Sequence, residues 1–122
     1  MELDCPPELR QAAETAVRAA GLSDCHLAVE LVDEHRIQEL NRRFRGRDSP
    51  TDVLAFPVDG SEPAPGPREL GDVVVCPERA EDVEEAVVHG ILHLAGHDHE
   101  SDRGEMLALQ DAVMRELRGA GS

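Results

Sequence analysis

The spacing of apolar residues along the chain predicts helices alternating with strands. Apolar positions recur every three or four residues, as on one face of a helix, at 7–21, 33–46, 80–95 and 101–119. Apolar and β-branched residues alternate or run together, as in strands, at 26–32, 51–58 and 71–76. The proline- and glycine-rich stretch 59–67 predicts a loop. The pattern therefore indicates an α+β fold in which about four helices pack on a small sheet, expected to be mixed.

Capping residues support the expected helix boundaries. Pro7 lies in the first turn of the first helix, and glycines follow the ends of the first three helices. Asp33 is the expected cap of the second helix, whose apolar stripe includes Phe44. The last helix is expected to begin after Ser101 or Asp102 and to close at Gly119.

Length and composition limit the possible classes of protein. The chain has 122 residues, enough for a single domain over 1–122. Its 26 acidic and 12 basic residues give a net charge of −14, which disfavours nonspecific adhesion of the whole surface to nucleic acid or to an anionic membrane, and DNA is not an expected partner. The sequence contains neither a run of about 20 apolar residues nor a signal-peptide pattern, so no membrane association is expected. Three widely spaced cysteines predict free thiols and a cytoplasmic location.

Four of the six histidines lie within eleven residues and predict a metal site. His89 and His93 are four residues apart, so on a helix their side chains share one face. Gly96 permits a turn that brings His99 toward them, and this spacing is typical of a catalytic zinc site with one position left for water. We expect one Zn²⁺ per chain, although three imidazoles also accept other divalent transition metals. His97 is interpreted as a neighbouring or surface residue, and the role of Asp98 stays open.

Gly90 weighs against a peptidase. In zinc peptidases of the HExxH type, the residue after the first histidine is the glutamate that acts as the base. Glycine has no side chain to act in this way. Because Asp98 or Glu100 could still supply a carboxylate, a zinc peptidase remains a minor alternative.

An arginine cluster predicts contacts with phosphate. Four arginines lie within six residues, where guanidinium groups would match phosphate oxygens: Arg42, Arg43, Arg45 and Arg47. The alternative is that they complement the end of the helix and pair with nearby acids such as Glu39 and Asp48. Since Phe44 and Phe56 are the only aromatic residues, RNA binding is expected to depend on the backbone and to weaken with salt.

These residues together resemble the YbeY family of metal-dependent endoribonucleases. The family's HGxLHLxGxDH motif is matched at 89–99, and two further blocks are matched at 40–57 and 70–72. The resemblance implies an α+β fold, zinc held by His89, His93 and His99, and an arginine important for cleavage at Arg45. The implied substrates are single-stranded RNA and small-subunit rRNA, in rRNA maturation and ribosome quality control, with the ribosome or its assembly factors as partners.

The chain also departs from the family pattern. Ala55 stands where the family usually has serine, the segment between Asp72 and His89 is shorter, and the strand before the first helix is reduced to a few residues. These departures affect the expected shape of the groove and the choice of substrate more than the metal site. Because the chain is acidic and has few aromatic residues, an alternative function is a ribosome-assembly factor in which zinc is structural and catalysis is weak.

Overall fold

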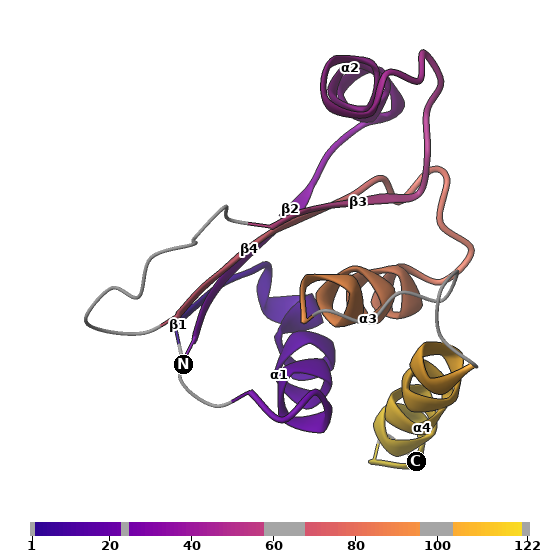
Figure 1. Cartoon of the computed structure of the whole chain (residues 1–122). Coiled ribbons are helices and arrows are strands. Elements are labelled where there is room, and N and C mark those ends of the chain that lie inside the picture. The colour runs from indigo at the N-terminus through magenta and orange to yellow at the C-terminus, as the bar shows by residue number, and fades with distance from the viewer. Residues whose placement is uncertain (1, 23–24, 58–67, 96–103, 121–122) are drawn as a thin grey trace.

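The computed structural model of the chain describes residues 2–22, 25–57, 68–95 and 104–120. Within these ranges the elements follow one another as strands, helices and one short 3-10 turn: β1 (Glu2–Asp4), η1 (Pro7–Leu9), α1 (Arg10–Ala19), β2 (Cys25–Leu31), α2 (Glu34–Arg45), β3 (Val53–Pro57), β4 (Arg68–Val75), α3 (Val83–Leu94) and α4 (Glu105–Ala120) (Figure 1). The predicted α+β class is confirmed, with four α-helices and four strands in the described residues.

The sheet is mixed, as predicted, and β3 lies at one edge of it. The strand order is β1-β2-β4-β3 in the described part of the chain. β1 pairs with β2 and β2 with β4 in parallel, whereas β3 runs antiparallel to β4, with Leu54 opposite Val74. The three-residue β1 matches the shortened first strand expected from the sequence. One side of β3 therefore has no neighbouring strand among the described residues.

The helices cover the two faces of the sheet unequally. α1, α3 and α4 lie on one side of the sheet, and α2 lies alone on the other (Figure 1). The larger core joins α1, α3 and α4 to alternate strand residues such as Leu27, Val73 and Val75. The smaller core lies under α2, where Ile37 and Leu40 pack near Leu54, Val74 and Cys76. The alternation of side chains along β3 and β4 thus serves both cores.

The caps predicted for α2 are confirmed. The Asp33 side chain accepts a hydrogen bond of 2.8 Å from the backbone N–H of Arg36. Gly46 adopts the left-handed conformation (φ 73°) and its N–H donates to the Asn41 carbonyl. Phe44, however, is not part of the buried stripe: its side chain is 59% exposed.

Other predicted boundaries were wrong by a few residues. α3 begins at Val83 and not at residue 80, because the Asp82 side chain caps it by accepting from the Glu85 N–H at 3.2 Å. β4 begins at Arg68, three residues before the expected start, and α4 continues through Gly119. Gly96 and the caps predicted at Ser101 and Asp102 lie outside the described residues. No helix in the described ranges has the length and apolar character needed to cross a membrane.

Gly90 allows α3 to lie close to the sheet. A Cβ atom at this position would stand 2.7 Å from Val73 Cγ1 and 3.2 Å from Val53 Cγ2, closer than van der Waals contact permits. Val73 belongs to β4 and Val53 to the edge strand β3, so Gly90 is a point at which α3 packs directly against this edge of the sheet.

We therefore expect Gly90→Ala to lower the free energy of unfolding by about 1–3 kcal/mol through overpacking. The measurement is urea denaturation followed by circular dichroism. Gly119→Ala is the matched control, because nothing lies within 4 Å of a Cβ there. It should leave the free energy of unfolding unchanged or raise it by up to about 1 kcal/mol. Equal stability of Gly90→Ala and the parent chain would contradict the close packing.

Candidate active site

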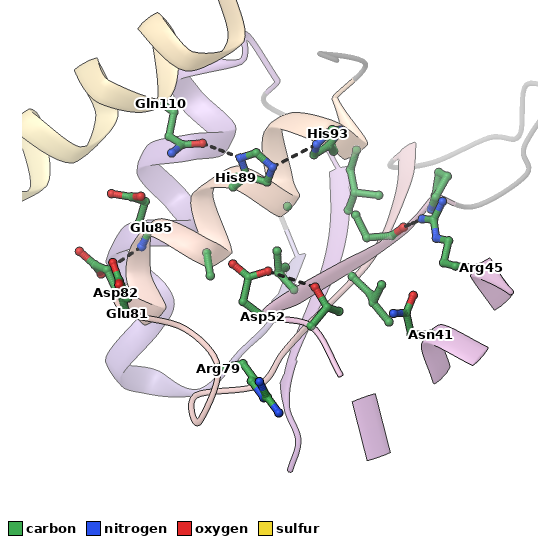
Figure 2. Close-up of a pocket in the computed structure, with 18 of the residues that line it drawn as sticks. Asn41, Arg45, Asp52, Arg79, Glu81, Asp82, Glu85, His89, His93 and Gln110 are labelled. Atoms are coloured by element: carbon green, nitrogen blue, oxygen red, sulfur yellow. Dashed lines mark hydrogen bonds between the residues drawn. The ribbon is translucent and has the colours of Figure 1, made fainter. Parts of the chain in front are cut away.

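A cleft of about 1400 Å³ follows the outer edge of β3 and separates residues of α2 from residues of α3. Four residues of β3 line it, and the helices contribute polar side chains to both walls (Figure 2). The polar and charged lining residues are Asn41, Arg45, Arg47, Thr51, Asp52, Arg79, Glu81, Asp82, Glu85, His89, His93, Gln110 and Arg118. The cleft thus brings together residues from the histidine motif and from the arginine cluster.

His89 and His93 converge on one wall of the cleft. Both side chains are half-buried and project from successive turns of α3. Their Nε2 atoms are 3.2 Å apart, and their ring centroids are 4.7 Å apart with an interplanar angle of 73°. Because each ring directs the same nitrogen to a common point, the predicted juxtaposition of the two histidines is found in the structure.

Gln110 of α4 fixes the orientation of the His89 ring. Its Oε1 atom lies 2.7 Å from Nδ1 of His89 (Figure 2). An amide oxygen can only accept, so Nδ1 carries the proton in this contact, and in the neutral ring Nε2 keeps its lone pair. The lone pair therefore faces His93. Gln110 could not be identified from the sequence, because it is 21 residues from His89 and belongs to no recognisable motif.

The two imidazoles fit a tetrahedral divalent cation. Two nitrogen ligands about 2.0–2.1 Å from such an ion are about 3.3 Å from each other, which agrees with the observed 3.2 Å between the Nε2 atoms. The third predicted ligand, His99, lies outside the described residues, as do His97 and Asp98. Among the described residues, no group of three histidines, cysteines or acids is placed to hold a metal.

Arg45 lies on the other side of β3 from the histidines (Figure 2). It is the last residue of α2, and its Nη2 donates a hydrogen bond of 2.5 Å to the Ala55 carbonyl on β3. Its Cζ atom also lies 5.8 Å from the centroid of the Phe56 ring. Two contacts with the edge strand therefore hold an otherwise exposed guanidinium at the cleft.

Comparison with known proteins identifies the family. A sequence model described as "Endoribonuclease YbeY" matches residues 4–118. The chain belongs to the YbeY endoribonuclease family. It is 48% identical over 96 residues to the endoribonuclease YbeY of Rubrobacter xylanophilus, covering 76% of this chain and 68% of the relative. It is 37% identical over 125 residues to that of Persephonella marina, covering 90% and 82%.

A solved structure supports the same fold. The solution structure of a Thermotoga maritima protein superimposes with a TM-score of 0.60 at 32% sequence identity. The match covers 97% of this chain and 90% of the other. Membership of the YbeY family supports an endoribonuclease role, and such an enzyme acts on RNA.

The packing of Gly90 bears on the peptidase alternative for this YbeY-family site. A side chain there would begin in contact with Val73, on the face of α3 that packs against the sheet. A glutamate at this position would therefore be directed at the sheet and not at the histidine rings. The packing itself disfavours the HExxH arrangement.

The four clustered arginines do not act as one patch in the structure. Arg45 and Arg47 line the cleft. Arg42 borders a separate hollow of about 260 Å³ with Asp48, and Arg43 forms an ion pair of 3.7 Å with Glu39. The alternative that nearby acids pair with this cluster therefore applies to Arg43.

Acidic residues line the cleft at the end nearer the start of α3 (Figure 2). One of these acids, Asp82, has two structural tasks there: it caps α3 and also pairs with Arg118 of α4 at 2.5 Å. Glu81 and Glu85 lie beside it and are exposed. Acids therefore predominate at this end of the cleft, although Arg118 pairs with one of them, whereas Arg45 lies on the other side of β3, so a polyanion is favoured beside Arg45.

Proposed function

We propose that the protein is a zinc-dependent endoribonuclease that cleaves phosphodiester bonds in single-stranded RNA. The observation that carries this proposal is that one cleft is lined both by His89 and His93, with their paired Nε2 atoms, and by Arg45. The chain that contains this cleft belongs to the YbeY endoribonuclease family. His99 is the proposed third ligand. Other divalent transition metals would suit the same donor set.

The histidine wall supplies the metal-binding groups. When bound, zinc would act as a Lewis acid that polarises a phosphoryl oxygen or a water molecule. The task of His89 and His93 is to present neutral imidazole lone pairs at the right separation. Gln110 assists by holding the proton of His89 on Nδ1, as residues hydrogen-bonded to metal ligands commonly do.

Arg45 is proposed to bind the phosphate that is cleaved. A guanidinium has five N–H donors, and the bond to the Ala55 carbonyl uses one of them. The remaining donors are free to contact phosphoryl oxygens and to offset the negative charge that grows on them in the transition state. Arg47 also lines the cleft and adds positive charge for the RNA backbone.

The cellular setting is proposed from the family resemblance. Small-subunit rRNA is the proposed substrate, in rRNA maturation and ribosome quality control, with the ribosome or its assembly factors as partners. A cytoplasmic location is supported by the three cysteines, none of which forms a disulfide.

Burial raises the pKa of the Cys5 thiol, so that this thiol remains protonated at neutral pH.

The decisive experiment is cleavage of a single-stranded oligoribonucleotide by purified protein, with metal content measured in parallel. We expect about one Zn²⁺ per chain, loss of cleavage after treatment with a chelator, and recovery when Zn²⁺ is returned. His93→Ala should lose both metal and cleavage. If His93→Ala nevertheless restores ribosome maturation in a deficient strain, catalysis is dispensable and the role as an assembly factor is correct.

Gln110→Ala should weaken zinc binding about 10- to 100-fold, because the His89 ring loses the acceptor that fixes its tautomer. Affinity is measured by competition with a chromophoric chelator. Gln110→Glu keeps an acceptor and should restore tight binding. The control is Asp111→Ala on the same helix, where an exposed acid pairs with Arg115 at 3.0 Å. Parent-like zinc affinity in Gln110→Ala would remove Gln110 from the site.

Arg45→Ala should lower the cleavage rate by about 100- to 1000-fold with zinc content unchanged, because the transition state loses a charge-assisted contact. The measurement is single-turnover cleavage together with metal analysis. Arg36→Ala is the matched control, since Arg36 is an exposed arginine of α2 that pairs with Glu39 at 3.1 Å and does not line the cleft. An Arg45→Ala protein that cleaves at the parent's rate would exclude Arg45 from the mechanism.

A further inference from the structure

Phe44 is a large apolar side chain that the fold leaves in water. It lies in the last turn of α2, between Arg43 and Arg45, and is 59% exposed. The only other large apolar side chain exposed to this degree among the described residues is Leu107 on α4. Phe44 therefore contributes less to the core than its position in the apolar stripe of α2 suggests.

Neighbouring groups hold the Phe44 ring in a fixed place. Its centroid lies 5.4 Å from that of Phe56, in an edge-to-face arrangement with an interplanar angle of 70°. The Arg43 guanidinium carbon lies 5.6 Å from the Phe44 centroid, and that of Arg45 lies 5.8 Å from the Phe56 centroid. The two aromatic residues of the whole chain thus form one cluster between two cations.

This cluster adjoins the cleft. Phe56 belongs to β3, and its two neighbours in that strand, Ala55 and Pro57, line the cleft. Arg45 also lines it and contacts the Phe56 ring. The Phe44 ring is consequently separated from the proposed phosphate-binding guanidinium by a single intervening ring.

We propose that Phe44 is a stacking surface for an unpaired nucleobase of the RNA, next to the phosphate bound by Arg45. This inference rests on the proposed function. Its chemical basis is that each nucleobase has a flat π-face that stacks on an aromatic ring, while the adjoining phosphate requires a cation. Phe44 supplies the ring and Arg45 supplies the cation within one turn of α2, although the net charge of the chain is −14.

The proposal gives a structural reason for a preference for single strands. In an RNA duplex the bases are stacked on one another and their faces are not available to a side chain. Unpaired bases can turn out and stack on an exposed ring. Phe44 would therefore favour single-stranded over double-stranded RNA, because only the single strand has a base free to stack. Arg45 and Arg47 would contact phosphates, which single-stranded and double-stranded RNA both possess.

The test is binding of a single-stranded 2′-O-methyl oligoribonucleotide, which the enzyme cannot cleave through its 2′ position, to the full chain over a range of salt concentrations. Phe44→Leu should raise Kd by about 5- to 30-fold, because leucine remains apolar but has no π-face. The slope of log Kd against log salt should not change, since no phosphate contact is lost. Phe44→Trp keeps a π-face and should bind as tightly as the parent. Leu107→Ala, which changes an exposed apolar residue away from the cluster, should also bind like the parent.

A second probe separates stacking from other effects. An abasic strand with the same backbone should bind the parent and Phe44→Leu with equal affinity. Equal affinity of both proteins for the base-bearing strand would overturn the stacking proposal and leave the proposed function standing. An equal loss for both strands would show that Phe44 acts through the arginines, which also overturns it. If the parent neither binds nor cleaves single-stranded RNA, the proposed function itself fails.

Discussion

The close approach of α3 to the sheet is the constraint on which the site depends. Gly90 removes the side chain that would otherwise hold the helix away from Val73 and Val53. Residues on one side of α3 are then buried against the sheet, and the positions one before and three after Gly90 turn toward the cleft. These positions hold His89 and His93, so the packing of the helix determines where the paired nitrogens face.

The second structural feature is the unpaired side of β3. Because β3 ends the sheet in the described residues, its outer backbone groups are available to side chains. Arg45 uses one of them through the Ala55 carbonyl, which brings a residue of α2 around the edge of the sheet. Residues from opposite faces of the sheet can therefore border one cleft.

Helix α4 packs with α3 in the larger core and also makes polar contacts with it. Gln110 bonds to His89 near the middle of α3, and Arg118 pairs with Asp82 at its N-terminal cap. Both contacts join exposed or half-buried groups, so they position α4 more than they stabilise the fold. The distribution of charge follows from the same assembly, because Asp82 and its acidic neighbours gather where α3 begins and the arginines gather where α2 ends.

The sequence by itself determined the class of fold, most helix and strand positions, the caps of α2, and the pairing of His89 with His93. These features depend on local spacing and on backbone preferences that a short segment carries with it. Only the tertiary structure decided that Arg45 and Arg47 border the histidine cleft while Arg42 and Arg43 do not, that Phe44 is exposed, and that Gln110 contacts His89. Each of these depends on how elements distant in the chain pack together, and no local pattern encodes that arrangement.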